Sequence, residues 1–599
     1  MIPNGLCHRC ARALRANVLA AAGMAASVLA AVPVPVLQGP IPSDLASPGR
    51  NHTFFATDLD LRSRGFVEEE FFFEGTADVY DATVAGGIGA RPTPSPTAKV
   101  VSSGHPYRTR MVVRRPASAR DFNGTVVVEW MNATSNYDVE ALWFRAHEFF
   151  LRDGYAWVGI TAQNGPIVNP TLGLKAFSPV RYGTLDLTAG GTLTSGDPLS
   201  YGVFAQGLQA VRHAGALGPL ASRVKNVIAT GVSQSAGRLG VFVNAIQPRD
   251  AAVADAVLLY IGGERLRTDL TIPIIKLLSE TEHTAPASAN EISSLQPDTE
   301  RLRVWAMAGT SHSDWASFAV RYAVLQRDQP SAPLRDNCAN PSRSRIPDRY
   351  VISAAIEGLK RWLEHGAAPP AAPPIALAAD GATVQRDANG NALGGIRLAP
   401  FAVPVALDAG YNANPPGGQG LCFLNGTHLP FDTATLNALY PDHHSYVRQV
   451  ADAVERNVRD GFVLVPDAKE MLEQARTAIW GQGWTCGPLC ANVAQFPIQP
   501  STQLLHDHVQ FLYMVAGERL LDAIDAATRE VALGDSQSDA ARRTHHYGQA
   551  VLALQRFKQL MVVQEQLGRA TAEQSTLLRG YADALIGELA KLGAVVKGD

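Results

Sequence analysis

The chain has 599 residues, of which 46% are hydrophobic, so it is long enough for two or three domains with buried cores. Its formal net charge is only -3, and it contains no long run of one charge sign. These properties argue against nucleic acid as a partner, because nucleic-acid-binding proteins present a basic surface.

The N-terminus has the parts of a secretory signal. The basic residues Arg9, Arg12 and Arg15 precede an apolar stretch, residues 18–32, that ends in small residues. We therefore predict that residues 1–32 are a signal peptide and that the mature protein is secreted or periplasmic, without stable membrane insertion. The alternative is an uncleaved N-terminal anchor, but the apolar stretch is shorter than the ~20 residues of a full membrane span.

Strand and helix patterns alternate between residues 50 and 368. This alternation predicts an α/β fold with a mainly parallel central sheet, covered by helices on both faces. The predicted strands are short and apolar, and they comprise residues 110–114, 125–130, 155–161, 224–230, 252–261, 272–278 and 302–307. Helical spacing of apolar residues marks residues 139–151, 201–213 and 351–363.

A serine lies in a tight turn directly after the predicted strand 224–230. The turn has the sequence Gly231-Val232-Ser233-Gln234-Ser235-Ala236-Gly237, and helical spacing follows it. Strand, turn and helix around G-x-S-x-S match a nucleophile elbow whose last glycine is replaced by serine. Ser233 is therefore the candidate nucleophile. Ser235 is its rival, but Ser235 lies one step into the helix and lacks a glycine two residues before it.

A serine hydroxyl is a weak nucleophile, so Ser233 needs a histidine base and an acid that orients the histidine. In this architecture both follow the serine, first the acid and then the histidine. Glu280 and Glu282 compete for the acid position after strand 272–278. The distance from the strand end favours Glu282, and Asp255 is a weaker choice. His312 follows strand 302–307 in the sequence Ala-Gly-Thr-Ser-His, which places it at the sheet edge of Ser233.

An acyl-transfer site also needs two donors for the negative charge that develops on the carbonyl oxygen. One is the backbone N–H of Gln234, directly after the nucleophile. The other should come from the polar loop after strand 125–130, where we choose Ala133 within residues 132–134.

The remainder of the chain divides at a proline-rich stretch, residues 369–374. We predict a catalytic core at residues 50–368, an irregular extension with helices at 375–500, and a helical bundle at 501–599. The short link between residues 261 and 272 leaves little room for a lid there. We therefore expect residues 164–198 and 375–500 to shape the substrate site.

Four cysteines follow the predicted signal peptide, which fits an oxidising compartment. Cys486 and Cys490 are the pair most expected to form a disulfide, although sequence does not determine the pairing. A zinc site is the weaker alternative. The paired histidines, at 443–444, 506–508 and 545–546, lack the spacing of metal ligands, so we predict no metal site and no cofactor.

These motifs resemble the α/β-hydrolase superfamily, and more narrowly the bacterial α/β-hydrolase-domain proteins with G-x-S-Q-S-(A)-G-R at the elbow. The resemblance rests on residues 231–238, on the Glu-Thr-Glu of residues 280–282, on residues 308–312 and on residues 354–370, and it covers roughly residues 50–480. It implies a serine-hydrolase fold with Ser233, Glu282 and His312 in the catalytic positions, and it implies no definite substrate.

We therefore expect a hydrolase that cleaves a small-molecule carboxylic ester through a Ser-His-Glu triad and an acyl-enzyme intermediate. Two alternatives remain open. One is an amidase or peptidase with the same triad, and the other is a catalytically silent hydrolase fold that serves as a binding module. No oligomeric state follows from the sequence.

Overall fold

A computed structural model describes residues 31–45, 50–83, 97–249, 252–286, 289–418, 420–441, 443–477, 517–566 and 572–593. All but the last two residues of the predicted signal peptide lie outside these ranges, as do Cys486 and Cys490. Within them, no helix combines the length and the apolar character that a membrane span requires.

A nine-stranded sheet forms the centre of the fold, in the order β1-β2-β3-β5-β4-β6-β7-β8-β9. Its strands are β1 (Val36–Gln38), β2 (Phe66–Asp81), β3 (Lys99–Pro116), β4 (Thr125–Trp130), β5 (Ala156–Ile160), β6 (Asn226–Val232), β7 (Ala256–Tyr260), β8 (Ile274–Ser279) and β9 (Leu302–Met307). All neighbours from β5 to β9 are parallel, whereas β1, β2 and β3 pair antiparallel. The predicted α/β fold with a mainly parallel sheet is confirmed.

The antiparallel edge is larger than the sequence indicated, because charged residues interrupt its apolar pattern. Only residues 110–114 of β3 were predicted, and β2 was missed. In β2, Glu70 is completely buried, and its carboxylate pairs with the equally buried Arg110 of β3 at 2.8 Å and with Arg181. Buried charge pairs thus hold together strands that the apolar pattern did not reveal.

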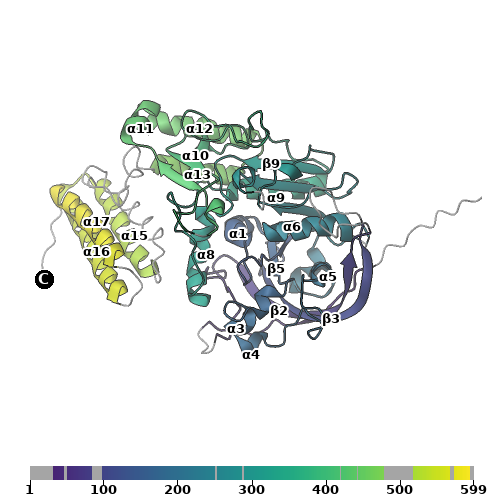
Figure 1. Ribbon diagram of the computed structural model, residues 1–599. Helices are drawn as coiled ribbons and strands as arrows, with labels where there is room; N and C mark the ends of the chain where they lie inside the picture. The colour runs from purple at the N-terminus through teal and green to yellow at the C-terminus, as the bar shows by residue number, and fades with distance from the viewer. Residues whose placement is uncertain are drawn as a thin grey trace, which may run out of the picture.

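Helices surround the sheet (Figure 1). The main ones are α1 (Trp143–Asp153), α5 (Ser200–His213), α6 (Gln234–Val241), α8 (Trp315–Asp328) and α9 (Arg349–His365), and short helices are α2 (Gly165–Val168), α3 (Leu174–Phe177), α4 (Pro179–Tyr182) and α7 (Thr281–Thr284). Helix α1 packs against α8 and α9, α9 contacts β6, β7 and β8, and α6 contacts β4, β6 and β7.

The segment after the proline-rich stretch shares the core of the sheet. It contains α10 (Ala399–Ala402), β10 (Ala406–Ala409), β11 (Thr427–Pro430), α11 (Thr433–Leu439), α12 (His443–Arg459) and α13 (Val465–Thr477). Figure 1 draws α10, α12 and α13 together near β9. The rings of Trp305 in β9 and Phe462 lie 5.1 Å apart, and one hydrophobic cluster joins buried residues from Val32 to Ala475. This segment is therefore packed onto the sheet.

Three C-terminal helices enclose a core of their own. They are α15 (Gly517–Asp535), α16 (Ala540–Gln566) and α17 (Ala572–Lys591), which Figure 1 draws in yellow and yellow-green. Their buried residues, from Leu520 to Leu589, form a cluster separate from that of the sheet. The predicted helical C-terminal region is confirmed.

Candidate active site

The turn between β6 and α6 holds Ser233 in a strained backbone conformation, with φ 59° and ψ -120°. The helix then crosses close behind the strand. A Cβ at Gly231 would lie 2.5 Å from the carbonyl oxygen of Ser235, so only glycine fits there. Ser235 itself is buried, and its hydroxyl bonds both the N–H and the carbonyl of Val232, at 2.9 and 3.0 Å. Ser235 therefore closes the turn, and Ser233 is left to face the site.

Three predicted residues meet at the carboxyl edge of the sheet. Nε2 of His312 lies 2.7 Å from Oγ of Ser233, and Nδ1 of His312 lies 2.6 Å from Oε1 of Glu282. The second oxygen of Glu282 accepts hydrogen bonds from the N–H and the hydroxyl of Ser279, at 2.8 and 2.6 Å. The serine hydroxyl, the imidazole and the carboxylate thus form one chain of hydrogen bonds.

The two rival acids have other partners. The carboxylate of Glu280 pairs with Arg386 at 2.8 Å and accepts the N–H of Gly410 at 3.1 Å. Asp255 forms an ion pair with Arg212. Among the three acids that the sequence offered, the structure brings only Glu282 to the histidine.

The environment of Glu282 keeps its carboxylate ionised. Burial by itself raises the pKa of this group, but the hydrogen bonds and charge of His312 and the hydrogen bonds from Ser279 outweigh burial. The net effect lowers the pKa of Glu282 below its ordinary value of 4.5. An ionised carboxylate beside Nδ1 fixes the ring with a proton on Nδ1 and leaves Nε2 to accept one from the serine.

Backbone contacts hold His312 in place. Its N–H donates to the hydroxyl of Thr281 at 2.9 Å, and its carbonyl accepts from Nη2 of Arg145, also at 2.9 Å. Arg145 is buried and pairs with Asp348 at 3.1 Å and Asp314 at 3.4 Å. Sequence reasoning missed Arg145, because it lies 167 positions from the histidine and no local motif marks it.

The predicted oxyanion donors lie in the loop after β4 and at the first residue of α6. Nδ2 of Asn132 donates to the carbonyl of Val232 at 2.9 Å, which ties the loop after β4 to the elbow. The N–H of Ala133 reaches the side-chain oxygen of Gln234 at 3.5 Å, which is longer than a normal hydrogen bond. Gln234 is the first residue of α6, so its own N–H has no partner one turn earlier in the helix.

A cavity of about 190 Å³ opens beside Ser233 and His312. Val232, Ile261 and Ser313 also line it, and most of its wall comes from four other parts of the chain: residues 132–145, Leu172, residues 321–343 and residues 421–425. Leu172 belongs to one segment that was expected to shape the site, and residues 421–425 belong to the other. The contribution of residues 321–343 was not predicted.

A model of the family described as "Alpha/beta hydrolase domain" matches residues 37–473. The chain belongs to this family. Membership confirms the superfamily that the elbow motif predicted, while the narrower bacterial group stays a prediction.

Solved structures show low overall similarity to this hydrolase-family chain. A cold-adapted esterase from an Arctic intertidal metagenomic library is 13% identical over 43% of this chain and 94% of that one, with a TM-score of 0.23. A CE15 glucuronoyl esterase from Teredinibacter turnerae is 12% identical over 38% and 46%, with a TM-score of 0.17. A prolyl endopeptidase is 9% identical over 46% and 34%, with a TM-score of 0.20. A comparison with curated proteins finds no match.

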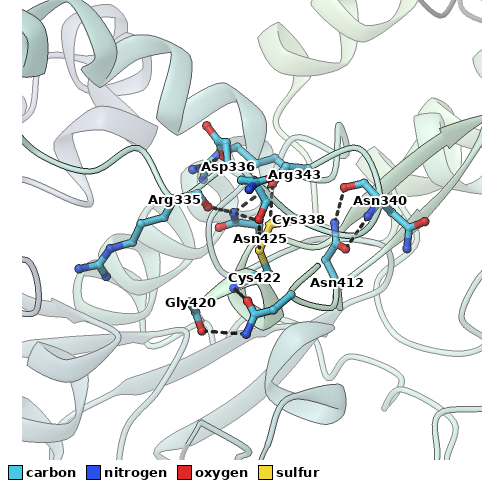
Figure 2. Close-up of a disulfide and its surroundings, with 12 residues drawn as sticks. Arg335, Asp336, Cys338, Asn340, Arg343, Asn412, Gly420, Cys422 and Asn425 are labelled. Carbon is cyan, nitrogen blue, oxygen red and sulfur yellow. Dashed lines mark hydrogen bonds and ion pairs between the residues drawn. A yellow bond between two sulfur atoms is a disulfide. The ribbon is translucent and has the colours of Figure 1, made fainter. Parts of the chain in front are cut away.

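A disulfide between Cys338 and Cys422 joins two pocket loops of this α/β-hydrolase (Figure 2), with their Cα atoms 5.6 Å apart. Nδ2 of Asn425 reinforces the junction, donating to the carbonyl of Arg335 at 2.8 Å. The sequence favoured a bond between Cys486 and Cys490, and that pairing stays a prediction because both lie outside the described residues. In the described part of the chain, no cluster of His, Cys, Asp and Glu is arranged to hold a metal ion.

Proposed function

We propose that the protein is a serine hydrolase that cleaves carboxylic esters through a covalent acyl-enzyme intermediate. The observation that carries the proposal is the hydrogen-bonded chain from Ser233 through His312 to Glu282, at the edge of a cavity in an α/β-hydrolase domain. A serine, a histidine base and a buried carboxylate in this order activate a hydroxyl for acyl transfer.

In the proposed reaction, Oγ of Ser233 attacks the ester carbonyl carbon while Nε2 of His312 takes its proton. The ionised carboxylate of Glu282 stabilises the imidazolium that forms. His312 then gives the proton to the departing alcohol oxygen, which leaves the acyl group on Ser233. His312 takes a proton from water as the water oxygen attacks the acyl carbonyl carbon. The imidazolium then returns this proton to Oγ of Ser233 as the bond between the acyl group and the serine breaks, which releases the acid.

The oxyanion would be bound by the backbone N–H groups of Gln234 and Ala133. The contact from Ala133 to the side chain of Gln234 is long, at 3.5 Å, so an oxyanion displaces a weak partner at little cost. Such fixed backbone donors stabilise the charge that develops on the carbonyl oxygen.

The test measures hydrolysis of para-nitrophenyl butyrate and labelling by a fluorophosphonate. We expect S233A to lose a factor of about 10³ or more in kcat and to lose the label, because no other group replaces the nucleophile. The matched control is S235A, which should keep the label at Ser233. Full hydrolysis by S233A would refute the proposal.

The same assay separates the alternatives. Faster cleavage of a para-nitroanilide than of the matched ester would identify an amidase or peptidase. A folded protein that neither hydrolyses esters nor takes up the label would be a silent binding module.

We further propose that the mature protein acts in the periplasm or outside the cell. The disulfide between Cys338 and Cys422 supports this location, because such bonds persist mainly in oxidising compartments. Fractionation of expressing cells, with the enzyme located by the fluorophosphonate label, tests it. Label confined to the cytoplasmic fraction would contradict it.

A further inference from the structure

We propose that the ester substrate carries a carboxylate, which Arg321 and Arg335 bind inside the pocket beside Ser233. The inference rests on the proposed ester hydrolysis and specifies its substrate class. Four arginines line this pocket, namely Arg145, Arg321, Arg335 and Arg343, and its described lining contains no aspartate, glutamate or lysine.

Two of these arginines are already neutralised by the protein. Arg145 is paired with Asp348 and Asp314, as described above. Arg343 is buried and pairs with Asp336 at 2.7 Å. Their charges are therefore balanced without a ligand.

Arg321 is different. It lies on α8, and its Nε is buried without a hydrogen-bond partner. Its guanidinium lies 5.3 Å from the ring centroid of Phe318, and within the described chain it forms no ion pair with a carboxylate. A buried N–H without an acceptor is costly, because it has lost its hydrogen bonds to water. A substrate carboxylate in the pocket supplies the missing acceptor.

Arg335, in the loop after α8, is the second arginine. Its backbone has a φ of 58°, which is rare for a residue with a side chain, and the bond from Asn425 to its carbonyl holds it there. The disulfide of Cys338 with Cys422 anchors the same loop three residues later. Figure 2 shows the Arg335 side chain extending away from this anchored cluster. Among the described residues, its guanidinium has no carboxylate partner. The positive charge of Arg335 therefore stands on a fixed backbone and can pair with a substrate carboxylate.

The other wall residues indicate what connects the carboxylate to the ester. Leu172, Leu334, Leu421 and Leu424 line the same pocket. Apolar side chains favour a hydrocarbon between the two polar groups. A guanidinium binds a carboxylate through two parallel hydrogen bonds, which gives geometric specificity as well as attraction. The substrate class is therefore an ester with a carboxylate across an apolar spacer.

Two matched substrate pairs test the inference and locate the carboxylate. The first pair compares mono-para-nitrophenyl adipate, which carries a carboxylate on its acyl group, with the neutral para-nitrophenyl hexanoate. The second pair compares para-acetoxybenzoate, which carries the carboxylate on its alcohol group, with the neutral para-acetoxybenzamide. We expect the unchanged enzyme to prefer the anionic member of at least one pair by about tenfold or more in kcat/KM. Equal or lower kcat/KM for both anionic esters would overturn the inference.

Variants assign the preference to the two arginines. In R321Q and R335Q, the ratio of kcat/KM for the anionic ester to that for the neutral ester should fall about tenfold. R335E provides a second variant at the exposed position and should invert the ratio. The control is R120Q, which removes an exposed arginine outside the pocket and should leave the ratio unchanged. Circular dichroism verifies folding, and a folded R335E with an unchanged ratio would overturn the inference.

Binding of adipate to the unchanged full-length protein separates this inference from the proposed catalysis. Calorimetry should detect adipate binding that weakens about tenfold in R335Q. If S233A still hydrolyses esters, the proposed nucleophile is wrong, yet the adipate result still decides the anion site. If adipate binds equally to the unchanged protein and to R335E, the anion site is wrong while ester hydrolysis stands.

Discussion

Glu280 and Glu282 lie two positions apart, but their carboxylates have different neighbours. Glu282 faces His312 at 2.6 Å, whereas Glu280 faces Arg386 and Gly410 in the segment beyond the proline-rich stretch. Both carboxyl groups are almost completely buried. Loss of charge should therefore impair catalysis at one position and packing at the other.

The paired variants E282Q and E280Q test this division of roles. E282Q should lower kcat by about 10²–10⁴, because the amide no longer stabilises the imidazolium or fixes its tautomer. E280Q should keep most of its kcat but lose about 1–3 kcal/mol of unfolding free energy, since Arg386 is left with a weaker partner and is only partly buried. Ester assays and urea unfolding measure the two effects. A loss of kcat in E280Q as large as in E282Q would contradict this assignment.

At the scale of elements, a buried carboxyl group joins β4 to α1. Glu129 in β4 accepts hydrogen bonds from the backbone N–H groups of Leu142 and Trp143 and from the indole of Trp157. Burial raises the pKa of Glu129 to about 8, despite these hydrogen bonds. The folded protein therefore holds a proton on Glu129 at a pH where the unfolded chain has released it.

This difference predicts a pH-dependent stability. Between pH 4.5 and about 8 the folded state binds the extra proton, so the unfolding free energy contributed by Glu129 falls as the pH rises. The glutamine of the variant E129Q resembles the protonated acid and does not titrate. Between pH 5.5 and pH 7.5, the unfolding free energy of E129Q should therefore fall by about 2 kcal/mol less than that of the unchanged protein. Urea unfolding at the two pH values measures the difference. Equal losses in both proteins would show that Glu129 does not titrate in this window.

The disulfide joins two pocket loops that also meet through a bridge between Ser342 and Thr427 and through the hydrogen bond from Asn425 to Arg335. The double variant C338S/C422S should lose about 2–5 kcal/mol of unfolding free energy. Its KM should rise more than its kcat falls, because the loops form the pocket wall whereas the triad stands on β6, β8 and β9. Urea unfolding and steady-state kinetics measure these changes. An unchanged KM would indicate that the loops hold their positions without the bond.

The sequence predicted well the elements in which the pattern of apolar residues agrees with the burial of the segment in the fold. Strands β4 and β9 have the predicted bounds, because each is a short, mainly apolar segment, as is typical of strands in a covered parallel sheet. Strand β2 was missed because it carries Glu68, Glu69 and Glu70, whose partners lie on other segments. The elbow motif led to Ser233, and chain order together with the position after a predicted strand led to Glu282 and His312. The contact of Arg145 with His312 and the proposed roles of Arg321 and Arg335 could not be predicted, because they depend on how distant parts of the chain come together.

At the scale of the whole molecule, the described chain has two hydrophobic cores. The larger core includes residues on both sides of the proline-rich stretch, among them Ile375, Phe401 and Phe462. The smaller core lies entirely within α15, α16 and α17. The proline-rich stretch at 369–374 therefore does not separate two domains. It lies within one packed unit, and Trp305 of β9 donates a hydrogen bond to the carbonyl of Pro370 at 2.9 Å.

Two truncations follow from this division. A chain that ends after Thr477 keeps the larger core and every residue of the pocket, so it should fold and retain its kcat on para-nitrophenyl butyrate. A chain that ends after residue 374 loses the apolar side chains that cover β9 and removes Arg386, the partner of Glu280, so it should fail to fold. Circular dichroism and fluorophosphonate labelling compare the two. Full activity in the shorter chain would show that the catalytic sheet is stable without residues 375–477, because an incompletely packed sheet would not position Glu282 and His312 around Ser233.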